Sequence, residues 1–142
     1  PMGANVLELF HRTRDWHRLE DDECDEMCSH FTVVSGYHET MELRSDDNPK
    51  IVIAGSGMLT GGRMLNYLET QAQNPDNTLL FVGYQAEGTR GRKLLEGEKE
   101  LKVYGKTVSF KMQVAEIEGL SAHADHAELL DWLSDVNLWL GE

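Results

Sequence analysis

The chain has 142 residues, of which 40% are hydrophobic and 27% are charged, and it contains three prolines. This composition is typical of one folded globular domain and excludes a disordered or fibrous protein. The longest uncharged apolar stretches are far shorter than the roughly 20 residues that a membrane-spanning helix needs, so insertion into a membrane is excluded as well.

The cysteines and the start of the sequence bear on the cellular compartment. No basic and apolar leader opens the sequence, and the two cysteines, Cys24 and Cys28, stand on one predicted helical face and cannot form a disulfide framework. We therefore expect a reducing, cytoplasmic setting.

The net charge of −12 is unevenly distributed along the chain. Residues 1–49 carry a net charge of −8, residues 50–111 carry +3, and residues 112–142 carry −7. Eight of the 13 glycines lie between Gly55 and Gly97, inside the cationic part. Nucleic-acid binding usually leaves a basic footprint, so a site for an anion is expected in this middle part.

In the acidic first part, two helices and then a short β-prone segment at residues 31–34 are predicted. Residues 4–10 place apolar side chains at helical spacing, which predicts a first helix. Residues 20–26 contain six acids in seven positions, and we interpret them as the solvated start of a second helix in preference to an acid-lined metal site. Residues 45–49 form a breaker cluster that ends this part.

The middle part shows the pattern of a strand, a helix and a second strand. Residues 51–54 are a continuous apolar run bounded by glycine, as in a strand buried on both faces. Met64, Leu65 and Leu68 keep helical spacing, and residues 78–82 form a second apolar run. Such a βαβ unit implies a parallel sheet with ligands at the carboxyl ends of its strands, where both glycine-rich loops begin.

The last part is predicted to contain a hairpin, a strand and a helix. Apolar residues alternate on both sides of residues 104–106, which indicates a hairpin, and residues 112–117 predict another strand. A helix is predicted over residues 125–133, because Asp125 and Glu128 have capping-box spacing and the leucines that follow form a buried stripe.

The first glycine-rich loop, residues 54–63, leaves the first predicted strand and enters a helix. Its glycines let backbone N–H groups approach an anion, and Ser56 and Thr60 add hydroxyl donors. It is not a P-loop, because no Gly-Lys-Ser/Thr follows, and the dinucleotide fingerprint fits poorly because no acid ends the second strand. Contact with phosphate and a tight turn needed only for packing fit this loop equally well.

The second loop, residues 83–93, places Arg90, Arg92 and Lys93 within four positions, next to glycines and Tyr84. Such a loop could follow a nucleic-acid backbone, with the arginines binding phosphate and the tyrosine stacking on a base. Solvated charge at the start of a helix is the commoner reason for such a pattern.

A third segment, residues 119–126, has three interpretations. It matches the zinc signature His-x-His-x-Asp-His at His123, Asp125 and His126, but Ser121 occupies the first ligand position. Alternatively, His123 is a lone imidazole between a strand and a helix that transfers a proton or contacts phosphate. A structural histidine is the third interpretation.

Taken in order, these segments resemble the β-CASP group of metallo-β-lactamase-fold nucleases, which includes ribonuclease J and the endonuclease subunit of the pre-mRNA 3′-end processing complex. Residues 1–4 are similar to the opening of the inserted β-CASP domain, and residues 53–63 to its glycine loop. Residues 81–92 resemble its second loop, and residues 121–125 resemble the segment that carries the motif B histidine. The resemblance covers nearly the whole chain.

The resemblance implies an α/β fold, a three-layer α/β/α arrangement with a mainly parallel, Rossmann-like sheet. Residues 1–111 would be most of the β-CASP domain, and residues 112–142 a short strand and helix at the start of the returning metallo-β-lactamase segment. In the family, other segments bind two zinc ions, and this sequence lacks them. The chain is therefore expected to be a fragment that holds no metal and is inactive, cut from a zinc-dependent enzyme that hydrolyses RNA phosphodiester bonds.

The resemblance also assigns roles to residues. His123 becomes the catalytic motif B residue and not a zinc ligand, Ser121 and Asp125 orient it, and His126 receives no role. The predicted phosphate-binding residues lie in the two glycine-rich loops: Gly55, Ser56, Gly57, Thr60, Gly61, Gly62, Arg90 and Arg92. We expect the side chains of Ser56, Thr60, Arg90 and Arg92 to line one anion-binding cleft.

The expected partners are single-stranded RNA and the missing metallo-β-lactamase lobe, with no membrane; a homodimer is left open. An alternative from another functional class is a stand-alone, Rossmann-like module that binds a phosphate or a nucleotide without catalysis.

Overall fold

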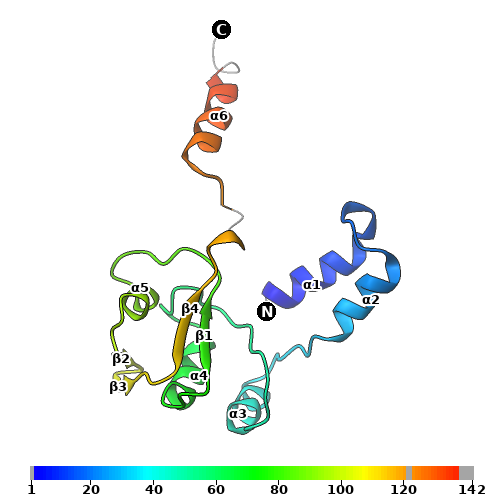
Figure 1. Cartoon of the computed structure of the whole chain (residues 1–142). Helices are drawn as coiled ribbons and strands as arrows, with labels where there is room; N and C mark the ends of the chain where they lie inside the picture. The colour runs from blue at the N-terminus through cyan, green and yellow to red at the C-terminus, as the bar shows by residue number, and fades with distance from the viewer. Residues whose placement is uncertain (1, 121–122, 138–142) are drawn as a thin grey trace. The chain divides into compact units, whose positions relative to one another are not determined.

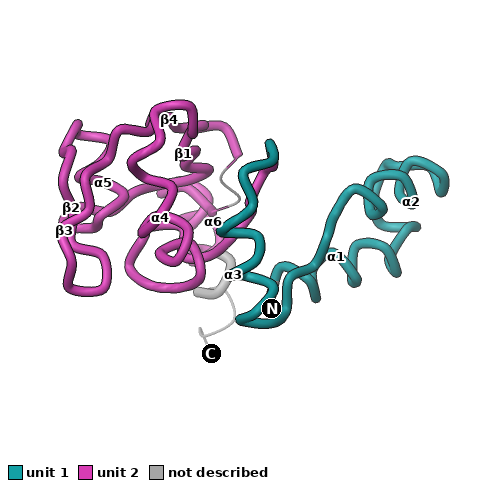
Figure 2. Tube along the Cα trace, turned by 90° about the horizontal axis from the view of Figure 1, so that it is seen from below, with its two compact units in different colours: residues 1–49 teal, residues 50–142 magenta. Residues whose placement is uncertain are grey.

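The computed structural model describes residues 2–120 and 123–137, and the chain divides into two compact units, Pro1–Pro49 and Lys50–Glu142 (Figure 2). The elements in chain order (Figure 1) are α1 (Met2–Arg12), the 3₁₀ helix η1 (Arg14–Trp16), α2 (Asp21–Ser29), α3 (Tyr37–Ser45), α4 (Met64–Gln71), β1 (Thr78–Phe81), α5 (Arg90–Leu95), β2 (Glu100–Val103), β3 (Lys106–Ser109), β4 (Gln113–Glu116), the 3₁₀ helix η2 (Glu118–Leu120) and α6 (His126–Asn137). None of the helices in the described residues has both the length and the apolar character needed to cross a lipid bilayer.

The first unit contains the two predicted helices and a third helix, α3, that the sequence did not indicate. Residues 31–34, predicted to be β-prone, form no strand. α1 covers the predicted first helix, and the acidic run forms the first turns of α2. The backbone N–H of Glu20 donates to Glu23 Oε2 over 2.9 Å, which closes a capping box and places negative charge at the positive end of the helix. α3 ends at Ser45, where the breaker cluster begins.

The side chain of Arg14 makes hydrogen bonds to two acids of the acidic run at residues 20–26. The Arg14 guanidinium donates to Asp21 Oδ1 over 3.2 Å and to Asp25 Oδ1, and His11 Nε2 lies 2.9 Å from the same Asp25 oxygen. The hydrogen bond from Arg14 is the main cause that lowers the pKa of Asp25. These contacts fit the interpretation of the acidic run as a solvated helix start.

The second unit contains both sheets. β1 pairs in parallel with β4, with Leu79 opposite Val114, and Figure 1 shows the two strands side by side. β2 pairs with β3 in an antiparallel hairpin, whose turn uses the left-handed region at Tyr104 and Gly105. The hairpin confirms the corresponding prediction, whereas the parallel partner of β1 is β4 and not residues 51–54, as the βαβ pattern predicted.

The hydrophobic core of this unit joins α4, α5 and the two sheets. The apolar faces of α4, α5 and both sheets contribute its buried residues: Leu59, Leu65, Leu68, Ala72, Leu79, Phe81, Leu94, Leu101, Val103, Val108, Phe110 and Met112. Leu59 belongs to the first glycine-rich loop, so that loop is anchored directly in the core.

The prediction of a buried strand at residues 51–54 is wrong for this chain. No strand forms there, and Ile51 and Ile53 are 93% and 81% exposed. A strand needs a hydrogen-bonding neighbour and a covering layer, and in the described residues β1 pairs only with β4. The fold is therefore mixed α/β, with two separate two-stranded sheets; the described residues form no clear three-layer sandwich.

The helix predicted over residues 125–133 is present as α6. The N–H of Glu128 donates to Asp125 Oδ1 over 2.9 Å, and the N–H of Asp125 donates to Glu128 Oε2 over 2.8 Å, so the predicted capping box is confirmed. The leucine stripe is not buried as predicted, because each of the three leucines is about half exposed: Leu129 by 50%, Leu130 by 53% and Leu133 by 49%. An amphipathic stripe is buried only where another element covers it.

Candidate functional site

The first glycine-rich loop folds tightly onto itself. The N–H of Leu59 donates to Ser56 O over 3.2 Å, and the N–H of Met64 donates to Gly55 O over 3.0 Å. Gly62 has φ +76°, and a Cβ atom there would lie 2.5 Å from Gly55 O. Only glycine satisfies this position, because the left-handed backbone and the approach of another backbone segment both exclude a side chain.

The loop presents several hydrogen-bonding groups. The hydroxyls of Ser56 and Thr60 lie 3.1 Å apart, and the N–H of Thr60 donates to Ser56 Oγ over 3.1 Å. Among the described residues, the N–H groups of Gly57, Gly61 and Gly62 have no acceptor. Amides without acceptors are able to donate to an anion.

The second glycine-rich loop leaves β1 and enters α5. Thr89 caps α5, since the N–H of Arg92 donates to Thr89 Oγ1 over 3.2 Å. Arg90, Arg92 and Lys93 therefore stand in the first turns of a short helix. Gly88, just before the cap, has φ +78°.

Three hydrogen bonds join the two loops directly. Gln85 Nε2 donates to Gly57 O over 3.0 Å, the N–H of Gly91 donates to Met58 O over 3.3 Å, and Arg90 Nη1 donates to Leu59 O over 2.9 Å. The two loops are thus packed directly against each other in the cationic part of the chain.

The two arginines already have protein partners. Arg90 donates to two carbonyls, Leu59 O and, through Nε over 2.8 Å, Lys102 O. Arg92 Nε donates to Glu96 Oε1 over 2.6 Å, and this hydrogen bond raises the pKa of the Arg92 guanidinium. Arg90 therefore links the first loop, α5 and the β2–β3 hairpin, whereas Arg92 makes an ion pair within one helix.

This difference predicts that replacing Arg90 lowers the free energy of unfolding more than replacing Arg92. Arg90→Met removes two hydrogen bonds from a charged donor and should lower the free energy of unfolding by about 1.5–3 kcal/mol. Arg92→Met removes an exposed i,i+4 ion pair on a helix surface, so it should lower the free energy of unfolding far less. Urea unfolding of the two variants measures both values. An equal or larger loss for Arg92→Met would show that the assignment of Arg90 is wrong.

The third predicted segment is only partly described. Ser121 lies outside the described residues, and His123 and His126 are exposed. Asp125 caps α6 through the hydrogen bonds given above. Residues 2–120 and 123–137 contain no group of three His, Cys, Asp or Glu side chains that could hold a metal ion.

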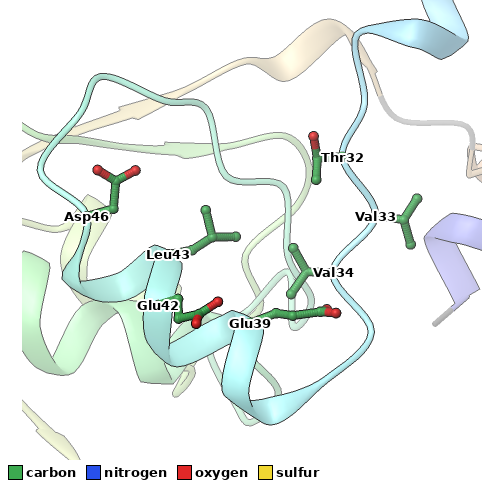
Figure 3. Close-up of a pocket in the computed structure, with 7 residues that line it drawn as sticks. All are labelled: Thr32, Val33, Val34, Glu39, Glu42, Leu43 and Asp46. Atoms are coloured by element: carbon green, nitrogen blue, oxygen red, sulfur yellow. The ribbon is translucent and has the colours of Figure 1, made fainter.

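Two features escaped the sequence interpretation. Gln85 is only 3% exposed and bridges the loops, although nothing in its local pattern distinguishes it from an ordinary loop residue. The first unit also contains an open hollow of about 420 Å³ (Figure 3), lined by Thr32, Val33, Val34, Glu39, Glu42, Leu43 and Asp46. None of the predicted site residues lines this hollow.

Two family models match the chain. The model of the Beta-Casp domain matches residues 1–94, and that of the "Zn-dependent metallo-hydrolase RNA specificity domain" matches residues 107–138. The predicted boundary between residues 111 and 112 falls inside the second match and remains a prediction.

Individual proteins match as well. The chain is 37% identical to transcription termination factor FttA of Methanothermobacter thermautotrophicus over 112 residues, which are 75% of this chain and 18% of that protein. It is 42% identical to FttA of Methanocaldococcus jannaschii over 108 residues, 72% of this chain and 17% of that protein. It is 34% identical to ribonuclease TTHA0252 of Thermus thermophilus over 145 aligned positions, 94% of this chain and 32% of that protein. The chain thus spans between about a sixth and a third of the length of these relatives.

Proposed function

The chain belongs to the Beta-Casp domain family, and from this premise we propose that it is the RNA-binding part of a longer, zinc-dependent ribonuclease. The name of the second matching family, an RNA specificity domain of zinc-dependent metallo-hydrolases, and the similarity to a ribonuclease support RNA as the ligand. On its own the chain would bind RNA without cleaving it.

The observation that carries this proposal is the direct contact between the two glycine-rich loops. The amides of Gly57, Gly61 and Gly62 and the hydroxyls of Ser56 and Thr60 lie on the first loop, next to the first turns of α5. Each of these groups can donate to a phosphate oxygen. The surface would therefore hold the RNA backbone through groups that read no base sequence.

His123 is the proposed catalytic residue. It is exposed and lies just before α6, whose capping by Asp125 fixes the start of the helix close to it. An imidazole can donate a hydrogen bond or a proton to an oxygen of the scissile phosphate. In this proposal Ser121, together with Asp125, orients the imidazole of His123.

The two zinc ions belong to the longer protein in this proposal. A zinc site needs several His, Cys, Asp or Glu ligands, and the described residues bring no three of these together. In this proposal the zinc ligands lie in the missing metallo-β-lactamase lobe, the second partner beside RNA.

We also assign the predicted three-layer arrangement, with its mainly parallel sheet, to the longer protein. Leu80 and Val82 are 47% and 52% exposed at β1, and Ile51 and Ile53 are exposed on a segment with strand composition. A three-layer α/β/α arrangement would bury both sets of side chains if residues 51–54 joined the sheet.

Titration of the 142-residue chain with a fluorescein-labelled single-stranded RNA of 20 uridines tests the proposed function. We expect weak, saturable binding, with log K falling linearly with log salt by about 0.7 for each phosphate contact. Ser56→Ala should weaken binding, whereas Ser29→Ala, in the acidic unit, should not.

Absence of saturable binding, or binding that salt does not change, would contradict this function. Tight binding of AMP by the chain alone would instead support the stand-alone nucleotide-binding module.

A further inference from the structure

Gln85 occupies an unusual position for an uncharged polar residue. Its side chain is 97% buried, since only 3% of the residue is exposed, and it sits between the two glycine-rich loops. Its Nε2 amide group has three acceptors: Gly57 O at 3.0 Å, Gly83 O at 2.9 Å and Tyr84 O at 3.3 Å. One amide thus contacts carbonyls of both loops.

The three carbonyls also fix the orientation of the Gln85 amide. If the amide were turned over, Oε1 would face three acceptors and the side chain would have no donor for any of them. Gln85 Oε1 is buried and accepts no hydrogen bond in the described residues. An unpaired buried oxygen costs free energy. In this orientation, however, the NH₂ group of Gln85 can donate to carbonyls of both loops.

Gly91 is shaped to receive this oxygen. A Cβ atom at Gly91 would lie 1.8 Å from Gln85 Oε1 and 2.8 Å from Gln85 Cδ. Gly91 is itself buried, and its N–H donates to Met58 O, one residue after the carbonyl that Gln85 binds. Gln85 and Gly91 therefore act on adjacent peptide groups of the first loop.

We propose that Gln85 is a positioning residue. Its packing against Gly91, named the lock from here on, sets the spacing between the two glycine-rich loops and so shapes the surface that binds phosphate. The part concerning phosphate rests on the proposed function. The lock itself is a property of the loops and can be tested without RNA.

A double-mutant cycle of unfolding free energies tests the lock, using the wild type, Gln85→Ala, Gly91→Ala and the double variant. Gly91→Ala should be clearly destabilising, because its methyl group overlaps an amide that three hydrogen bonds hold in place. In the Gln85→Ala background the same methyl group should cost much less, since the nearest remaining atom is Phe81 Cε1 at 3.0 Å. Wild-type stability of Gly91→Ala, or additive losses, would overturn the proposal.

RNA affinity tests the consequence for binding. Gln85→Met keeps the volume and removes the amide, so the folded variant should bind the 20-uridine RNA about three- to tenfold more weakly than the wild type. Gln113→Met, an exposed glutamine on β4, serves as the control and should bind as the wild type does. Unchanged affinity of folded Gln85→Met would overturn the positioning role.

The two failures are distinguishable. If the wild type binds no RNA, the proposed function fails, together with the phosphate part of this inference, while the double-mutant cycle still decides whether Gln85 and Gly91 form the lock.

Discussion

Replacing His123 by alanine in the longer protein is expected to lower the turnover of RNA by about 10²–10⁴-fold, the usual contribution of a general acid or base. The zinc content should stay at the wild-type value, because the proposal gives His123 a proton-transfer role and not that of a zinc ligand. Turnover under saturating RNA and zinc per molecule by elemental analysis measure the two quantities on the same preparations.

His126→Ala provides a matched control for this experiment. His126 is the first residue of α6 and is exposed like His123, but it receives no role in the reaction. Its turnover should stay close to that of the wild type. If His123→Ala lost zinc and turnover in equal proportion, His123 would be a metal ligand and its assignment here would be wrong.

Gly62→Ala is expected to lower the free energy of unfolding of the chain by about 2–4 kcal/mol. The left-handed backbone at φ +76° disfavours any side chain, and the new methyl group would meet Gly55 O at 2.5 Å. Because the obstacle is backbone, no rotamer change can relieve it. Urea unfolding monitored by circular dichroism measures the loss.

Gly61→Ala is the control one residue away. A Cβ atom at Gly61 would meet nothing within 4 Å, and its φ lies outside the left-handed region. Its stability should therefore stay within about 0.5 kcal/mol of the wild type or rise slightly, as it does when alanine restricts the unfolded chain. Similar losses at both positions would mean that the loop is not closed as described.

Local patterns predicted the elements well. The acidic run predicted the start of α2, capping-box spacing predicted the start of α6, and apolar alternation located the β2–β3 hairpin. The strand β1, although not its parallel partner β4, followed from its apolar run and the glycine after it. These features depend on residues close in sequence, which is why one sequence was enough to predict them.

Burial was harder to predict than the elements. Ile51, Ile53 and the leucine stripe of α6 are apolar but exposed. A side chain is buried only where another element covers it, and a local sequence pattern does not show which element that is. The pattern also could not show the protein partners of Arg90, which donates to the carbonyls of Leu59 and of Lys102, the latter 12 positions along the chain. The contact of the arginines with phosphate stays a prediction.

The bridging role of Gln85 could not be predicted for a similar reason. Its partners include Gly57 O, 28 positions earlier in the chain, and the close fit against Gly91 is visible only in three dimensions. The family resemblance, by contrast, was readable, because four segments in the right order are more specific than any one of them.

That the two glycine-rich loops form one phosphate-binding surface can be tested by an NMR titration of the ¹⁵N-labelled chain with the 20-uridine RNA. The largest shifts are predicted for the amides of Gly57, Gly61 and Gly62, together with amides in the first turns of α5. Shifts confined to residues 1–49 or to α6, with both loops unchanged, would contradict it.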